Sequence, residues 1–169
     1  MNREPDKLLN VARALWENAM SQRGAHYKAS DHLRLWHYVL GFMLILFSAI
    51  VSGSVLQATD GNPSQALTLS AGALSVAVVV LTSVQTTFKL GERSEQHKSA
   101  AVGFGKIARK LDLLISRDHE DLDKAWAELT AINDEYDSVE AGAPGFLGRT
   151  YDKARAQVQD EARARYGTG

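Results

Sequence analysis

Two long uncharged stretches, residues 39–56 and 66–88, constrain the fold of this chain more than any other feature of its sequence. As α-helices they extend over about 27 Å and about 34 Å, against roughly 30 Å for the hydrocarbon core of a bilayer. Residues 57–65 connect them and contain Asp-Gly and Asn-Pro pairs, which are typical of turns. The pattern predicts an all-α membrane protein with a two-helix transmembrane hairpin over residues 39–88.

The distribution of charge supports this interpretation. All 19 Lys and Arg residues lie in 1–34 or 89–169, and Asp60 is the only charged residue between these ranges. A soluble bundle with two wholly buried helices is the alternative, but buried core helices typically show shorter apolar runs, of about 10–14 residues. Because cytoplasmic flanks carry the excess of Lys and Arg, we expect both termini in the cytoplasm and the connecting loop outside. The first apolar run begins too late for a cleavable signal peptide, so we expect it to be retained.

The sequence before the first apolar stretch predicts an amphipathic N-terminal helix within residues 1–38. Pro5 suits a first helical turn. Apolar residues recur at helical spacing through residues 5–34, at Leu8, Ala12, Leu15 and Ala19, with Trp16 alongside. We expect this helix to run into the first membrane span.

Residues 89–140 are predicted to form cytoplasmic helices that pack as a bundle. The helix of the second span is expected to continue beyond Phe88 without a break, with an apolar stripe at Phe104, Ile107, Leu111 and Leu114. Asp118 is expected to cap a further helix. Along that helix a heptad-like seam is a candidate for bundle or oligomer contacts: Leu122, Ala125, Leu129, Ile132, Tyr136 and Val139. Residues 141–169 are predicted to be a linker followed by a C-terminal helix at 149–166.

The sequence gives no indication of an enzyme, a cofactor or a dedicated nucleic-acid binder. Cysteine is absent, and the net charge of -1 is unlike that of a nucleic-acid-binding domain. The acidic cluster at 118–123 is interpreted as a hydrated helix start rather than a metal site, since carboxylates favour helix N-termini. The 5 histidines are interpreted as interfacial or bundle-packing residues. A proton-sensing role is the alternative for His97.

One face of the second span consists of small or hydroxyl-bearing residues. Its members lie within about 40° of one line on a helical wheel: Thr68, Gly72, Ser75, Val79, Thr82 and Thr86. Ser48 and Ser52 share a face of the first span. Such residues favour close helix packing in a membrane, and the same stripe can instead line a narrow, water-containing pore. The pore interpretation gains because a two-helix hairpin has little to pack on unless it oligomerises.

Four segments around the predicted hairpin occur in an order that resembles a known family. Residues 25–29 (AHYKA) precede the first span, and residues 81–86 (LTSVQT) close the second. A charged segment at 92–101 and an amphipathic helix at 104–112 follow. In this order the chain resembles the SLATT domain, the SMODS- and SLOG-associating two-transmembrane effector domain of prokaryotic conflict systems.

The resemblance implies a pore-forming or membrane-disrupting effector of antiphage defence, in the inner membrane of a prokaryote, that causes growth arrest or cell death. It also implies a tie to nucleotide second-messenger signalling. Residues 118–169 are too short and too helical to be a nucleotide-sensing domain. We therefore expect the trigger to come from a cytosolic sensor or nucleotide-signalling partner, or from the cytoplasmic helices themselves. The other expected partners are the lipid bilayer and further copies of the chain. His26, Tyr27 and His97 are candidate regulatory residues. The alternative is a membrane-anchored helical module that recruits a cytosolic partner without forming a pore.

Overall fold

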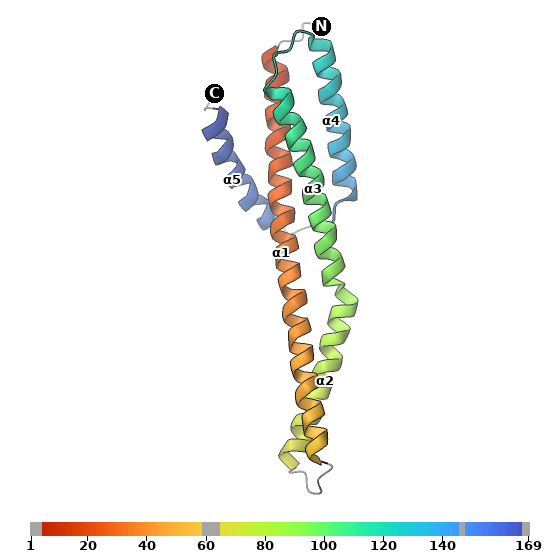
Figure 1. The fold of residues 1–169 in the computed structure, drawn as a ribbon. Coiled ribbons are helices and arrows are strands. Elements are labelled where there is room, and N and C mark those ends of the chain that lie inside the picture. The colour runs from red at the N-terminus through yellow and green to blue at the C-terminus, as the bar shows by residue number, and fades with distance from the viewer. Residues whose placement is uncertain (1–4, 59–64, 146–147, 167–169) are drawn as a thin grey trace. The chain divides into compact units, whose positions relative to one another are not determined.

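The structure, a computed structural model, describes residues 5–58, 65–145 and 148–166, which are helical apart from a turn at Lys89 and short irregular segments at 116–121 and 143–145. The helices in these ranges follow one another along the chain (Figure 1): α1 (Pro5–Ala58), α2 (Gln65–Phe88), α3 (Leu90–Ile115), α4 (Leu122–Gly142) and α5 (Gly148–Tyr166). The predicted all-α class is confirmed. Most of the turn expected at 57–65 lies outside the described residues.

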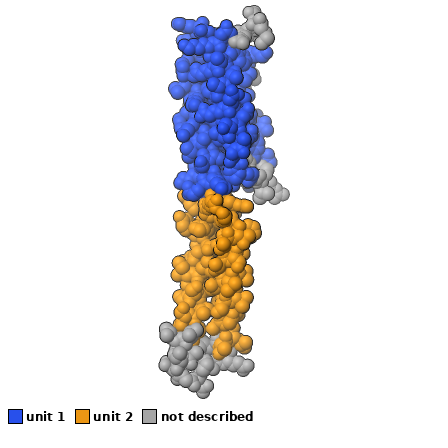
Figure 2. Space-filling model, turned by 90° about the vertical axis from the view of Figure 1, so that its right-hand side faces the viewer, with its two compact units in different colours: residues 1–31, 94–169 blue, residues 32–93 orange. Residues whose placement is uncertain are grey.

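The chain divides into two compact units (Figure 2). The first, which we name the helical bundle, comprises residues 1–31 and 94–169. The second, which we name the apolar pair, comprises residues 32–93. Helices α1 and α3 each contribute residues to both units.

Helix α1 includes both the predicted N-terminal helix and the predicted first span. Pro5 and Asp6 stand in its first turn, where a missing N–H costs nothing and a carboxylate is favoured. Gly24 does not interrupt the helix, and its missing side chain admits α5: a Cβ atom at this position would lie 3.4 Å from Cβ of Ala154. The N-terminal helix therefore continues into the apolar stretch without a break, as expected.

The expected continuous helix after Phe88 is wrong at one residue. Helix α2 ends at Phe88 and α3 begins at Leu90, and Lys89 between them has a φ of 45°. The N–H of Lys89 still donates to the carbonyl of Gln85 at 3.1 Å, and the carbonyl of Lys89 accepts from the N–H of Arg93 at 3.0 Å. Helical hydrogen bonds thus persist on both sides while the backbone turns at a single residue, which apolar periodicity cannot reveal.

The helical bundle encloses an apolar core to which four helices contribute. The buried core residues are Leu8, Ala12, Trp16 and Ala19 of α1; Ala100, Phe104, Ile107, Ala108, Leu111 and Leu114 of α3; Ala125, Leu129, Ile132 and Tyr136 of α4; and Val158 and Ala162 of α5. The predicted stripe on α3 is confirmed, because all of its members are buried. On α1 the large apolar side chains in this core are Leu8 and Trp16, and Leu15 is only partly buried.

The N-cap of α4 lies three residues later in the chain than the cap predicted at Asp118. The N-cap is Asp121, in an extended conformation, and its carboxylate accepts a hydrogen bond from the N–H of Lys124 at 3.1 Å. A capping side chain has to stand directly before the first helical residue, and the apolar repeat of α4 starts only at Leu122. The cap assigned to Asp118 was therefore wrong, and the chain between α3 and α4 is irregular at this point.

Within the apolar pair, α2 packs on the second half of α1 along one face only. On α1 the partly buried residues of this face are Leu40, Gly41, Leu44, Phe47, Val51 and Ser54; on α2 they are Ala71, Leu74, Ala77, Val78, Leu81, Val84 and Gln85. The side-chain amide of Gln85 donates to the backbone carbonyl of His37 at 3.2 Å. A Cβ atom at Gly41 would lie 3.6 Å from the same amide nitrogen, so Gly41 leaves room for Gln85.

The remaining surface of the apolar pair is apolar and open. Large side chains such as Phe42, Ile45 and Val76 are between 64% and 71% exposed. Two segments of the described chain are long and apolar enough to cross a membrane, and no residue of either apolar window is buried within the chain. Their hydrophobicity is therefore not explained by a core of this chain.

Candidate functional site

The small, hydroxyl-bearing face of α2 lies on the open surface of the apolar pair. All of its predicted members are exposed: Thr68, Gly72, Ser75, Val79, Thr82 and Thr86. Ser48 and Ser52 of α1 are exposed as well. Helix α2 therefore does not use this face to pack on α1. Whether the face lines a pore or packs on another copy remains a prediction.

The hydroxyl groups of this face have hydrogen-bond acceptors within their own helices. Ser75 Oγ donates to the carbonyl of Ala71 at 2.8 Å, and Thr82 Oγ1 donates to the carbonyl of Val78 at 2.8 Å. The same contact, one turn back along the helix, is made by Thr86 at 2.9 Å and by Ser52 at 2.9 Å. A hydroxyl bonded in this way satisfies its donor without water, so it can face lipid, a neighbouring helix or a pore.

The candidate regulatory residues His26 and His97 are brought together inside the helical bundle. Their Nδ1 atoms lie 2.9 Å apart, and the rings are 1% and 5% exposed. His26 also stacks on Phe104, with 5.6 Å between ring centroids, and Phe104 contacts Tyr136 of α4 at 5.3 Å. The histidines, 71 residues apart in sequence, thus form one buried polar contact between α1 and α3.

Burial, and then a charge on His97, lowers the pKa of His26 from 6.5 to about 4. Both causes disfavour the protonated ring, because the site offers little solvation and an imidazolium on one side repels a charge on the other. At neutral pH His26 is therefore uncharged.

A second buried polar contact lies one helical turn from the histidines. Ser94 Oγ donates to the backbone carbonyl of Ser30 at 2.9 Å, and the two serine hydroxyl oxygens are 3.2 Å apart. Both serines are buried. Sequence reasoning did not single out this pair. The available signal was that Ser30 follows His26 by four residues and Ser94 precedes His97 by three, which places each pair on one helix face.

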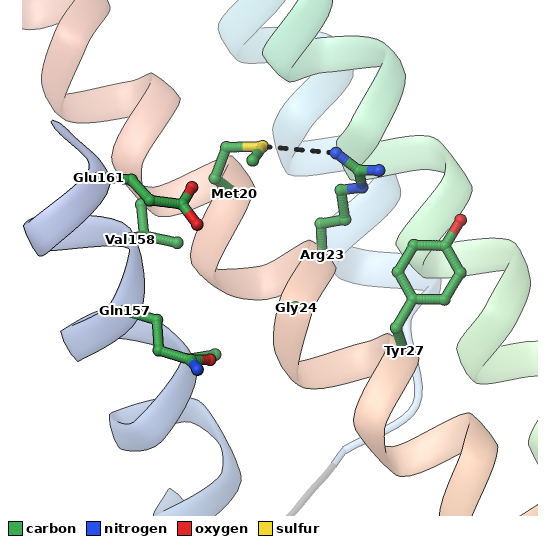
Figure 3. Close-up of a pocket in the computed structure, with 8 residues that line it drawn as sticks. Met20, Arg23, Gly24, Tyr27, Gln157, Val158 and Glu161 are labelled. Carbon is green, nitrogen blue, oxygen red and sulfur yellow. Dashed lines mark hydrogen bonds between the residues drawn. The ribbon is translucent and has the colours of Figure 1, made fainter. Parts of the chain in front are cut away.

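The third candidate regulatory residue, Tyr27, does not join the histidine pair. It lines an open groove of about 220 Å³ between α1 and α5 (Figure 3). Arg23 also lines this groove, with its guanidinium 5.7 Å from the centre of the Tyr27 ring and one nitrogen 3.7 Å from the sulfur of Met20. Gln157, Val158 and Glu161 of α5 face it from the other side.

The seam predicted on α4 packs within the chain itself. Leu129, Ile132 and Tyr136 are buried in the core of the helical bundle, and Leu122 is partly buried. The seam was predicted to make contacts either within a bundle or between copies of the chain. In a single chain, these side chains make contacts within the bundle. Among the described residues, no three His, Asp or Glu side chains are grouped so that they could hold a metal ion.

Comparison with known proteins assigns a family. A family model described as SMODS and SLOG-associating 2TM effector domain family 4 matches residues 8–166. The match covers nearly the whole chain, including α4 and α5, and is longer than the segment that carries the resemblance in the sequence. No curated protein and no solved structure gives a significant match.

Proposed function

We propose, because the chain belongs to the SMODS and SLOG-associating 2TM effector domain family 4, that it is an oligomeric effector that permeabilises a membrane. In this proposal α2 and the second half of α1 cross the inner membrane of a prokaryote as a hairpin. Both termini and the helical bundle lie in the cytoplasm, because the Lys and Arg residues lie on that side of both spans. Triggering by a cytosolic partner would open the assembly and cause growth arrest or cell death during antiphage defence.

The observation that carries this proposal is the open face of α2. Five small or hydroxyl-bearing residues, together with Val79, repeat along a helix of the apolar pair and are not used to pack on α1. A helix pair surrounded only by lipid has no need of such a stripe, whereas several copies that meet along it can approach closely. If the copies surround a central space, the hydroxyl groups offer oxygen atoms to water or ions. Since the stripe has no charged residue, we expect weak selectivity among ions.

A second function is favoured by a different observation. The hydroxyls of Ser75, Thr82 and Thr86 already donate to carbonyls of their own helix, so this face is also compatible with lipid. The helical bundle has its own core and an open groove between α1 and α5. The apolar pair could then be a membrane anchor and the bundle a docking module for a cytosolic protein.

Ion flux separates the two functions. The full chain is reconstituted in liposomes, and release of a trapped ion is measured together with the mass of the protein in detergent. Val79→Phe and Ser75→Phe place a bulky ring on the stripe and should abolish the leak while insertion persists. The matched control is Val80→Phe, the same change at the neighbouring exposed position, about 100° around the helix. Val80→Phe should keep the leak.

Two outcomes would contradict the pore. If Val79→Phe and Val80→Phe leak alike, the stripe does not line the path of the ions. If the wild-type chain does not leak in liposomes, and its toxicity in cells survives replacement of both spans by unrelated membrane helices, the membrane anchor is the correct function.

A further inference from the structure

Four polar residues occupy core positions where the helical bundle adjoins the apolar pair in sequence. Along α1 the buried positions run through Ala12, Ala19 and Ala25 and then end in His26 and Ser30. Along α3 the buried positions begin with Ser94 and His97 and become apolar from Ala100 onward. The same interface between α1 and α3 is thus apolar along most of its length and polar at this end. A polar layer holds helices together only while all of its hydrogen bonds are made.

The hydrogen bond between the two imidazoles depends on how many protons they carry. With both rings neutral, one Nδ1 carries a hydrogen and donates to the lone pair of the other Nδ1, 2.9 Å away. One added proton preserves this bond but places a charge in a buried site. With both rings protonated, each Nδ1 carries a hydrogen, so neither accepts and two positive charges face each other. The contact between His26 and His97 then becomes repulsive.

We propose that the His26–His97 pair is a proton-binding site that holds α1 against α3 while at most one of the two rings is protonated and releases the two helices when both rings are protonated. The site lies within the helical bundle and does not depend on whether the apolar pair forms a pore. Because α1 continues from His26 through Ser30 into the apolar pair as one helix, release at this layer frees the end of the bundle that adjoins the membrane segments in the chain.

The other titratable and charged groups around the layer do not account for a proton-dependent contact between α1 and α3. On the elements that pack around it they are Arg23, Tyr27, Lys28 and Asp31 of α1; Glu95 and Lys98 of α3; Tyr136 and Glu140 of α4; and Tyr151 of α5. Lys98 pairs with Glu95 at 3.9 Å in solvent, and Lys28 donates to Gln157 at 2.7 Å at the surface. Tyr136 is separated from His26 by the ring of Phe104. Burial and His97 are the causes that lower the pKa of His26, and no carboxylate is among them.

The direction of the pH effect follows from linkage. The pKa of His26 is lowered in the closed bundle, to about 4 from 6.5, so the closed state is fully favoured above pH 6.5 and loses stability as the pH falls toward 4. From His26 alone, the ratio of released to closed bundle should rise roughly 30-fold between pH 7.5 and pH 5.

The test measures the separation of α1 and α3 in the full chain. The sequence has no cysteine, so spin labels can be attached after Lys28→Cys and Ser99→Cys, two exposed positions on α1 and α3. Labelled protein is diluted with unlabelled protein in nanodiscs, which suppresses distances between copies, and a chelator removes metal ions. Distances are measured by pulsed electron resonance at pH 7.5, 6 and 5. A second population with a longer distance between the labels should appear as the pH falls. The ratio of this population to the closed one should rise about 30-fold between pH 7.5 and pH 5.

Three variants make the result specific. His26→Phe combined with His97→Phe fills the site with apolar rings and should abolish the longer distance at every pH. His26→Gln combined with His97→Gln keeps polar groups that do not titrate. It should likewise abolish the longer distance at every pH, and it serves as the test if the first variant does not fold. His32→Gln removes an exposed histidine and should respond like the wild type. A wild-type distance that stays constant down to pH 5, or an equal response after both imidazoles are removed, would overturn the proposal.

Discussion

Phe104 in the helical bundle and Phe42 in the apolar pair are the same residue on long helices, yet Phe104 is 0% exposed and Phe42 is 64% exposed. In the bundle, the apolar stripes of four helices meet in one core. In the apolar pair, two helices cover one face of each other and leave the other faces open. The more hydrophobic unit is thus the less buried one. Burial within a chain depends on the number of helices that share a core, and in the apolar pair the described helices leave large apolar side chains exposed.

The largest expected effect is on the stability of the helical bundle, and it is tested by removing one phenyl ring from each unit in turn. Phe104→Ala removes a fully buried ring that contacts His26 and Tyr136. It should destabilise the helical bundle by about 3–5 kcal/mol, because it leaves a cavity in a closed core. Hydrogen exchange of the detergent-solubilised protein, resolved by mass spectrometry, should show faster exchange in α4 and in α3 beyond Ser94.

Phe42→Ala is the matched control, since the same atoms are removed from an exposed position of the other unit. It should leave exchange in α4 unchanged. If both variants accelerated exchange in α4 equally, the two units would not be energetically distinct, and the contrast between a closed core and an open helix pair would fail.

Several features of the fold were predictable from sequence because they depend on local periodicity. Phe104, Ile107, Leu111 and Leu114 repeat at helical spacing and are all buried. The two uncharged stretches predicted apolar helices, which the structure contains. In contrast, the turn at Lys89 rests on the dihedral angle of one residue, and no repeat of side chains encodes that angle. Asp118 and Asp121 are chemically equivalent caps, and only the start of α4 decides between them.

The candidate site was predictable only in part, for a related reason. The stripe on α2 follows from spacing along one helix, and the structure places all of its members on one open face. His26 and His97 were both candidate regulatory residues, but they are 71 residues apart in sequence, so their direct contact could not be predicted. The serines beside them were missed because a buried serine contact depends on which helices meet. The groove at Tyr27 depends on where α5 lies, which a single charged helix does not reveal.

A smaller effect distinguishes the tyrosines of the two units. Burial, and then the carboxylate of Glu140, raises the pKa of Tyr136 from 10.0 to about 12. A raised pKa means that the folded bundle favours the protonated phenol, so the stability it contributes is complete below pH 10 and is lost as the pH rises through 12. At pH 11 the bundle should be less stable by about 1 kcal/mol than at pH 9 on account of this group.

Tyr136→Phe should remove that alkaline loss, and chemical unfolding of the bundle at pH 9 and pH 11 checks it. Tyr38→Phe, at a tyrosine of the apolar pair that is 66% exposed, is the control and should keep the wild-type loss. A Tyr136→Phe variant as sensitive to pH 11 as the wild type would show that the burial of this phenol does not govern the alkaline stability of the bundle.

The smallest expected effect concerns the backbone where α2 ends. Lys89 has a φ of 45°, a conformation that costs a residue with a side chain more than it costs glycine. Lys89→Gly should therefore slow hydrogen exchange around this residue, by a stabilisation of about 0.5–1 kcal/mol.

Lys98→Gly is the matched control: each lysine pairs with an exposed glutamate three residues away, at 3.1 Å for Lys89 and 3.9 Å for Lys98. Lys98 lies inside α3 with helical neighbours on both sides, so glycine there should cost about 1 kcal/mol. If glycine slows hydrogen exchange at position 89 and accelerates it at position 98, Lys89 is the point at which one helix ends and the next begins. If glycine accelerates exchange at both positions, the helix of the apolar pair continues into the bundle without a break.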